Sequence, residues 1–212
     1  MNKNYFELES TAKFFRDKAP DILVEKGISE IKSDGKNALD IGCGGGRNSL
    51  VLAEHCFDVQ ILDQNQVMLD TTIRTLLGKQ LKVNTAGIQD ISSLNIGKDN
   101  FDIILCIGVL HQNQAVTSLV ESIEKIYKSL KSGGVFVYNV FTSDYTDSSL
   151  VALGEGRYQT KENASMLLIL KNKYLEIFKS FGFEVIHEQY DLKEVNTGKR
   201  SILRGILRKA KD

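Results

Sequence analysis

One segment near the start of the chain limits the possible folds more than any other. Residues 38–41, Ala-Leu-Asp-Ile, form a short apolar run with one acid, and glycines follow at positions 42, 44, 45 and 46. A pattern typical of a helix begins directly afterwards, at residues 49–54. A buried strand that leads through a tight glycine turn into a helix N-terminus is the arrangement that holds nucleotide-type cofactors in α/β folds.

The spacing of the glycines narrows the class of cofactor. A dinucleotide fingerprint, G-x-G-x-x-G, needs its third glycine at position 47, where this chain has Arg47. The run is instead G-x-G-x-G, formed by Gly42, Gly44 and Gly46 and preceded by Asp40. Glycines let the backbone pass close to a bound ligand because no Cβ stands in the way. The spacing by itself therefore indicates an adenosine-containing ligand.

A second acid agrees with this interpretation. Asp63 ends a predicted strand over residues 57–63 and lies 17 residues beyond Gly46. That distance is close to the offset of about 20 residues at which an acid meets a ribose in wound α/β folds. Two neighbouring ribose hydroxyls can both donate to one carboxylate, so Asp63 is the candidate ribose ligand.

Three further segments follow in order along the chain. Residues 81–86 form a predicted third strand, and Asp90 comes shortly after it. Residues 101–107, Phe-Asp-Ile-Ile-Leu-Cys-Ile, form a fourth strand. Residues 130–137, Leu-Lys-Ser-Gly-Gly-Val-Phe-Val, form a turn that leads into a fifth.

These ordered segments, which together cover residues 37–141, resemble the class I S-adenosylmethionine-dependent methyltransferases. The glycine run is similar to motif I of that family, residues 101–107 to motif IV, and residues 130–134 to its L-K-P-G-G turn, with Ser132 where proline is usual. The likeness is closest to the tellurite-resistance type, which shares the runs at residues 42–49 and 58–63. In this family the acid at Asp63 binds the ribose, and the acid at Asp90 faces the adenine amino group, with the Ile91 backbone beside the ring.

The resemblance implies S-adenosylmethionine as cofactor and an α/β fold. The expected architecture is a three-layer Rossmann-like sandwich with helices on both faces of a seven-stranded, mostly parallel sheet of order 3-2-1-4-5-7-6, in which strand 7 is antiparallel. The sixth and seventh strands are expected at residues 183–187 and 201–207, and helices at 116–130 and 174–181. Gly182 has the position of a residue that ends a helix.

The chain is expected to form one domain, residues 1–212, with three parts. Residues 1–34 form a helical lid of two helices, 5–17 and 21–27, which Pro20 divides. Residues 37–141 bind the cofactor, and residues 142–212 form the acceptor side. Within the last part, residues 142–163 are expected to form a long binding loop without regular structure. Arg157 in this loop could bind an anionic acceptor, or it could belong to an ordinary surface loop.

The cofactor site implied by the resemblance combines the glycine turn with the acids and their neighbours. Asp40 has two interpretations, which can hold together: it accepts hydrogen bonds from the amides of the glycine turn, and it lies near the amino group of the methionine moiety. The predicted cofactor-binding residues are Asp40, Gly42, Cys43, Gly44, Gly46, Asn48, Asp63, Gln64, Gln89, Asp90, Ile91, Cys106 and Ile107.

His111 is the candidate catalytic residue, because it follows the fourth strand at the edge where open α/β sheets bind ligands. A neutral imidazole there could accept a proton from the acceptor, although a histidine that orients the following helix is an alternative. Methyl transfer from a sulfonium mainly requires alignment and exclusion of water, so no further catalytic motif is needed. No metal site is expected, because the cysteines lack metal-ligand spacing.

Composition bears on the substrate. Lysine plus arginine and aspartate plus glutamate both number 27, which argues against a nucleic-acid partner. No apolar run is long enough to span a membrane, and the odd number of cysteines, three, suits a reducing cytoplasm. The predicted function is a cytoplasmic methyltransferase for a small-molecule acceptor, as a monomer or homodimer. The alternatives are an RNA or protein methyltransferase and a non-catalytic binding subunit with the same fold.

Overall fold

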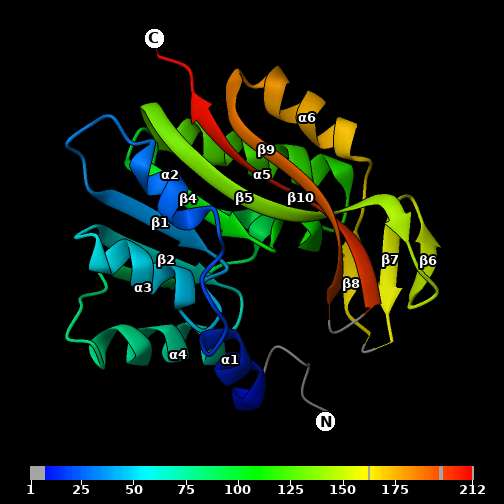
Figure 1. Ribbon diagram of the computed structural model, residues 1–212, viewed down its shortest axis with the longest axis horizontal. Coiled ribbons are helices and arrows are strands. Elements are labelled where there is room, and N and C mark those ends of the chain that lie inside the picture. The colour runs from blue at the N-terminus through cyan, green and yellow to red at the C-terminus, as the bar shows by residue number, and fades with distance from the viewer. Residues whose placement is uncertain (1–7, 162, 196–197, 212) are drawn as a thin grey trace.

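The computed structural model describes residues 8–161, 163–195 and 198–211. Its centre is a seven-stranded sheet of order β3-β2-β1-β4-β5-β10-β9, in which only β10 runs antiparallel to its neighbours (Figure 1). With β9 and β10 as the sixth and seventh strands, this is the predicted order, and the fold-class prediction is confirmed. The strands are β1 Asn37–Ile41, β2 Asp58–Asp63, β3 Thr85–Ile88, β4 Phe101–Ile107, β5 Leu130–Thr146, β9 Phe183–Val195 and β10 Gly198–Lys209.

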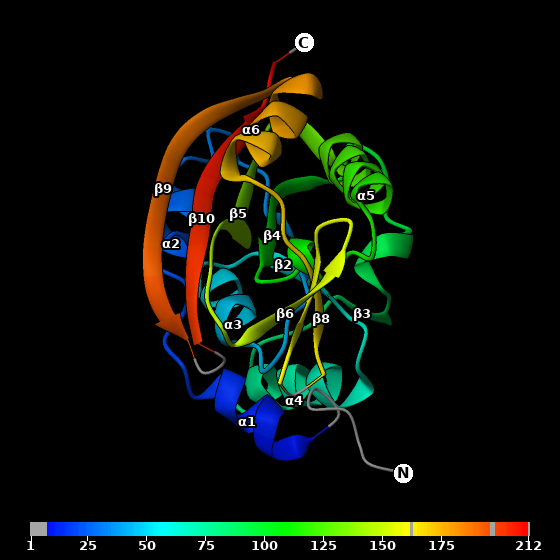
Figure 2. The same ribbon diagram turned by 90° about the vertical axis from the view of Figure 1, so that its right-hand side faces the viewer.

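Helices cover both faces of the sheet (Figure 2). One face carries α2 Val24–Ser29, α3 Arg47–Glu54 and α4 Gln66–Leu77, and the other carries α5 Val116–Ser129 and α6 Lys171–Ser180. The first helix, α1 Glu9–Arg16, packs against α4. No helix in the described ranges is long and apolar enough to cross a membrane.

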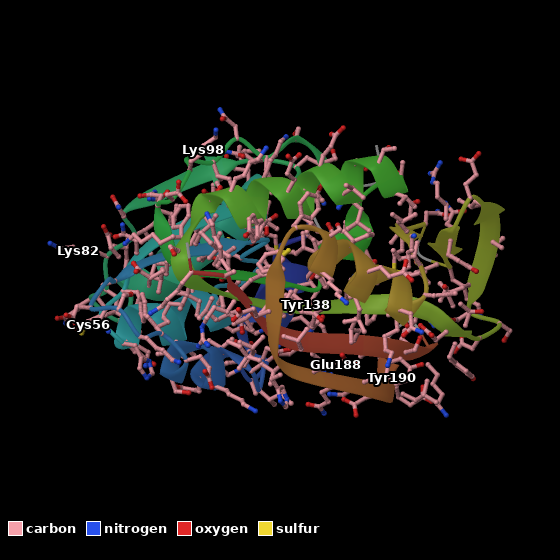
Figure 3. All side chains as sticks on the ribbon, turned by 90° about the horizontal axis from the view of Figure 1, so that it is seen from above. Cys56, Lys82, Lys98, Tyr138, Glu188 and Tyr190 are labelled. Atoms are coloured by element: carbon pink, nitrogen blue, oxygen red, sulfur yellow. The ribbon has the colours of Figure 1, made fainter. Side chains whose placement is uncertain are left out.

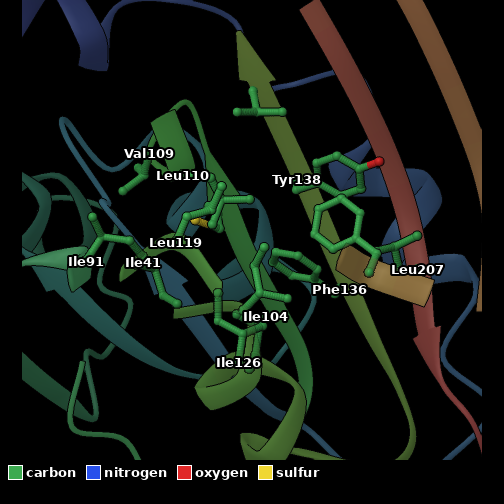
Figure 4. Packing of buried hydrophobic residues seen from close by; sticks show 14 of the residues in the cluster. Ile41, Ile91, Ile104, Val109, Leu110, Leu119, Ile126, Phe136, Tyr138 and Leu207 are labelled. Atoms are coloured by element: carbon green, nitrogen blue, oxygen red, sulfur yellow. The ribbon is translucent and has the colours of Figure 1, made fainter. Parts of the chain in front are cut away.

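Strand β4 shows why the central strands are almost entirely apolar. All of its residues except Ile107 are buried, because helices cover both of its faces. Ile103 and Leu105 belong to the cluster under α2 and α3, whereas Ile104 and Cys106 belong to the cluster under α5 and α6. Figure 4 shows part of the second cluster. There the ring of Phe136 stacks on Tyr138, with centroids 5.6 Å apart.

The two helices of the second face follow their predicted spacing closely. Buried residues of α5 include Leu119, Ile123 and Ile126, which recur at three- and four-residue intervals. Helix α6 ends at Ser180, and Gly182 follows in a left-handed conformation, with φ of +91°. The prediction that Gly182 ends this helix is confirmed.

The prediction of an irregular loop over residues 142–163 is wrong. Strand β5 continues to Thr146, and a separate three-stranded antiparallel sheet follows, built from β6 Leu150–Gly154, β7 Arg157–Thr160 and β8 Ser165–Leu167. We call these three strands the small sheet. They are short, and their burial does not alternate clearly, so the sequence pattern carries little of the strand signal.

Several predicted boundaries were also wrong. The third strand is residues 85–88 rather than 81–86, and β9 and β10 extend well beyond their predicted cores because they form one long antiparallel hairpin. Helix α2 begins three residues later than predicted, since the Asp21 carboxylate accepts a hydrogen bond from the Leu23 amide and forms a turn there. Residues 5–7 of the predicted first helix lie outside the described residues.

Candidate functional site

The glycine turn connects β1 to α3 at the carboxyl edge of the sheet. The amides of Gly42 and Cys43 both donate to the carbonyl oxygen of Leu62, at 2.7 and 3.1 Å, and this ties the turn to the end of β2. Gly42, Gly44 and Gly46 all have left-handed φ angles, +71°, +57° and +86°. Side chains rarely adopt this conformation, which explains the alternate spacing of the glycines.

One side of this turn is closed and the other is open. A Cβ on Gly45 would collide with the backbone of α1, at the Ala12 carbonyl oxygen and the Arg16 amide nitrogen. A Cβ on Gly44 would meet only the Phe15 Cβ, at 3.8 Å. Helix α1 therefore rests directly on the turn, while the space beside Gly44 remains open for a ligand.

Asp63 joins the end of β2 to the same turn. Its Oδ2 atom accepts a hydrogen bond from the Gly44 amide at 3.0 Å, and its Oδ1 atom accepts one from the Asn65 amide at 2.9 Å. The side chain is 7% exposed, and burial raises the pKa of the carboxyl above its usual value. Asp63 is thus a positioned carboxylate next to the open side of the turn.

Asp40 lies on the neighbouring strand and is almost fully buried. Its Oδ2 atom accepts a hydrogen bond from the Ser49 hydroxyl at 2.5 Å, while its Oδ1 atom is buried and has no hydrogen-bond partner among the described residues. Burial raises the pKa of Asp40 to about 6. The interpretation that Asp40 accepts from the turn amides is wrong, since Leu62 and Asp63 accept the bonds of Gly42, Cys43 and Gly44.

The predicted adenine side lies beyond β2 and β3. Asp90 is exposed at the start of a short 3₁₀ helix, η2 Ile91–Ser93, and its Oδ1 atom accepts from both the amide and the hydroxyl of Ser92. The side chain of Gln89 binds the backbone of Asn95 through both of its polar atoms. Ile91 is buried. Asp90 therefore keeps its second oxygen facing solvent at the edge where the resemblance puts the adenine.

Comparison with known proteins settles the family. A family model described as a methyltransferase domain matches residues 32–182. The chain belongs to this family.

Individual relatives agree with this membership. Over 116 residues the chain is 28% identical to the ubiquinone biosynthesis O-methyltransferase of Coxiella burnetii. The aligned segment covers 55% of this chain and 48% of that protein. Over 89 residues it is 33% identical to the probable S-adenosyl-L-methionine-dependent methyltransferase TehB of Haemophilus influenzae. Here the aligned segment covers 41% of this chain and 30% of that protein. The chain thus spans half or less of the length of these curated relatives.

The fold is shared with solved structures. A SAM-dependent methyltransferase from Methanosarcina mazei superposes with a TM-score of 0.73 at 19% identity, and the match covers 87% of this chain and 97% of that one. The resemblance to class I S-adenosylmethionine-dependent methyltransferases, close to the tellurite-resistance type, is confirmed. S-adenosylmethionine is accordingly the cofactor of the family to which this chain belongs.

Several predicted cofactor residues of the methyltransferase have structural contacts of their own. Asn48 accepts a hydrogen bond from the Asp21 amide at 2.9 Å, and this fastens the segment that follows α1. Cys43 and Cys106 are buried, and burial raises the pKa of both thiols. Ile107 is partly buried at the end of β4. Their role in cofactor binding stays a prediction.

The Gln64 side chain spans the carboxyl edge of the sheet. Its Nε2 atom donates to Oε1 of Gln112, at 3.2 Å. This bond links the segments that directly follow β2 and β4. Gln112 was not among the predicted site residues. The same is true of Thr72 and Thr75 on α4, which donate to the carbonyl oxygens of Gly44 and Gly45 at 2.8 and 3.1 Å. The sequence feature that could have indicated these two threonines is a pair of hydroxyl side chains three residues apart on one predicted helix.

His111 lies in the 3₁₀ helix η3 Leu110–Gln112, directly after β4. It is buried, its ring stacks on Phe141 with centroids 4.5 Å apart, and its Nδ1 atom accepts a long hydrogen bond of 3.4 Å from the Phe141 amide. Burial lowers the pKa of His111 to about 4. The imidazole is therefore neutral at pH 7, and Nε2 carries its proton in the tautomer that this contact requires.

Proposed function

We propose that the chain binds S-adenosylmethionine over the glycine turn and transfers the methyl group to a small-molecule acceptor. The observation that carries the proposal is a pair of buried carboxylates, Asp40 and Asp63, at the ends of the adjacent strands β1 and β2. Burial raises the pKa of both, and neither forms an ion pair with a described residue. Such a pair suits a ligand that brings a positive charge and hydroxyl donors.

The residues present fit this cofactor. The unpartnered Oδ1 atom of Asp40 is the acceptor that an ammonium group requires, and Asp63 is held by two amides where a ribose would donate to it. The open space beside Gly44 leaves room for the ligand to pass between the two carboxylates. Asp90 offers its free oxygen to the adenine amino group, as the family resemblance implies.

The chemistry is an in-line displacement. When bound, the cofactor supplies a methyl group on a positively charged sulfur, which is a good leaving group. The chain must hold the acceptor in line and exclude water. The small sheet contributes to this, because β8 packs against η3 at the end of β4. His111, neutral and with its Nε2–H available, can orient an acceptor oxygen; in this state it is a weak base, since its pKa is about 4.

Two observations favour a small acceptor. The formal net charge of the chain is zero, which does not favour a nucleic-acid substrate. The Coxiella burnetii relative is named as an O-methyltransferase of ubiquinone biosynthesis, which supports a small-molecule acceptor for this chain. All three cysteines are free thiols, as expected for an enzyme of the cytoplasm.

Thermal shift measurements with S-adenosylmethionine, S-adenosylhomocysteine and NAD test the cofactor. A ligand that binds only the folded state stabilises it by about 2.7 kcal/mol at a concentration 100 times its Kd. We expect stabilisation by the first two compounds, whereas stabilisation by NAD alone would contradict the proposal. Turnover on small thiols, phenols, carboxylates and chalcogen oxyanions, beside bulk RNA, tests the acceptor. Methylation confined to RNA would reject a small-molecule substrate.

A further inference from the structure

Arg157 faces the same edge of the molecule as the proposed site. It lies at the start of β7 and pairs directly with Leu167 of β8. Residues opposite one another in antiparallel strands project to the same face. Leu167 is fully buried and belongs to the cluster that contains Leu110 of η3, and β8 packs against η3. The Arg157 side chain is therefore on the face of the small sheet that is turned toward the end of β4.

The small sheet lies at the end of the molecule opposite to the C-terminal ends of α3 and α4. Figure 3 shows it at one end and, at the other, Cys56 and Lys82, which follow these two helices. With the cofactor at the ends of β1 and β2, as proposed above, the ends of the neighbouring strands β4 and β5 remain for the acceptor. The small sheet lies beyond that part of the edge, with β8 against η3 (Figure 1), and Arg157 is the cationic residue of its three strands.

Arg157 differs from the other arginines of the acceptor side. Arg200, Arg204 and Arg208 reach carboxylates at 3.1, 3.8 and 3.0 Å, belonging to Asp147, Asp191 and Glu30. Among residues 8–161, 163–195 and 198–211, no carboxylate lies within ion-pair distance of Arg157.

The hydrogen-bonding groups of Arg157 are also largely unused. Its Nε atom is buried without a partner in the described structure, and its Nη2 atom makes one long bond of 3.4 Å to the Ser165 hydroxyl. Glu155, the acid closest in sequence, is exposed and makes no ion pair with it. A desolvated guanidinium donor without an acceptor is costly, and a planar oxyanion satisfies two of its N–H groups at once.

We propose that the methyl acceptor carries a carboxylate or similar planar oxyanion, which the guanidinium of Arg157 binds while the nucleophilic atom is turned toward η3. This rests on the proposed function and names its class of substrate. Arg157 is then a specificity-determining residue, because it selects anionic acceptors over neutral molecules of the same shape.

Calorimetric titration of the protein saturated with S-adenosylhomocysteine tests the inference without any turnover. The probes are matched pairs that differ by a carboxylate: 3,4-dihydroxybenzoate and catechol, mercaptoacetate and 2-mercaptoethanol, indole-3-acetate and indole. The variants are Arg157→Gln and Arg157→Lys, with Lys161→Gln as control. Lys161 is an exposed cation in the turn after β7, so the control removes the same charge from the same sheet.

In at least one pair we expect the wild type to bind the carboxylate member about tenfold or more tightly than the neutral member. Arg157→Gln should lose this preference, Arg157→Lys should retain part of it, and Lys161→Gln should keep it. The absence of a carboxylate preference in every pair, or a preference that survives in Arg157→Gln, overturns the inference. Unchanged affinity for S-adenosylhomocysteine shows that the variants are folded. Wild-type protein that does not bind S-adenosylhomocysteine at all contradicts the proposed function itself.

Discussion

The carboxylate of Asp63 accepts a hydrogen bond from the backbone amide of Gly44, 3.0 Å away, and so joins the second strand to the middle of the glycine turn. The two residues are 19 positions apart in the sequence. They are adjacent in the site because β1 and β2 are parallel neighbours. The contact fixes the carboxylate before any ligand arrives. A preorganised acceptor binds with a smaller loss of conformational entropy.

Replacement of Asp63 by alanine is expected to weaken binding of S-adenosylmethionine strongly while the fold remains intact. The variant removes the proposed ribose acceptor and leaves the Gly44 amide next to open space, where water can reach it. We expect affinity to fall by about 100-fold, and calorimetric titration measures this. Asp58→Ala is the control, because Asp58 is an exposed acid at the start of the same strand. Equal affinity in the wild type and Asp63→Ala would show that the ribose lies elsewhere.

Asp40→Asn is expected to stabilise the free protein and to weaken cofactor binding. The folded-state pKa of about 6 lies above the ordinary value of 3.8, so the folded state holds the proton more tightly than the unfolded state does. Wild-type stability therefore falls as pH rises from 4 to 6, and ionised Asp40 costs about 1–3 kcal/mol above that range.

Urea unfolding at pH 5 and pH 7.5 measures this effect. The variant should gain stability over the wild type at pH 7.5 and gain less at pH 5, whereas a variant that is less stable at both pH values contradicts the assignment. Titration with S-adenosylmethionine at pH 7.5 should show weaker binding by the same variant, because the ammonium loses a charged partner.

His111 should make the protein sensitive to acid. Its folded-state pKa of about 4 lies below the ordinary 6.5, so the stability that it contributes is complete above pH 6.5 and is lost as pH falls toward 4. The loss is about 3 kcal/mol at most. The difference in unfolding free energy between pH 7 and pH 5 should be smaller in His111→Gln than in the wild type. His187→Gln, on β9, serves as control, and an equal difference in all three proteins would count against a buried neutral His111.

Two glycine substitutions test separately whether α1 rests on the glycine turn and whether the cofactor lies beside Gly44. Gly45→Ala should displace α1, because its Cβ would meet the backbone of Ala12 and Arg16. Gly44→Ala meets no such obstacle, but its left-handed φ costs about 1–2 kcal/mol and its methyl group points into the space proposed for the cofactor. Limited proteolysis near α1 and titration with S-adenosylhomocysteine distinguish them. Faster cleavage in Gly44→Ala than in Gly45→Ala would reverse this assignment.

The cofactor half was predictable because its signals are local. The strand of residues 101–107 was predicted with its observed bounds, since both of its faces are buried and its sequence is continuously apolar. The glycine turn and Asp63 follow from fixed spacing along the chain. Strand order, in contrast, came from the family resemblance and not from the residues themselves.

The small sheet and the contacts of Asp40 were not predictable in this way. Strands β6 to β8 pair with one another locally, and their place in the fold depends on the packing of β8 against η3, a segment far away in the sequence. Arg157 was assigned to a loop, and the unpartnered Nε atom of its guanidinium is visible only when its neighbours in space are known. The partner of Asp40, Ser49, lies in the first turn of α3, and the competing amide acceptors Leu62 and Asp63 come from the next strand.

A crystal structure with S-adenosylhomocysteine would show where the cofactor binds. We expect the ribose hydroxyls within hydrogen-bond distance of Asp63 and the ammonium group against the Oδ1 atom of Asp40, with the ligand passing beside Gly44. Ligand bound at another place, or a crevice at the ends of β1 and β2 that stays closed at saturating concentration, would contradict this expectation.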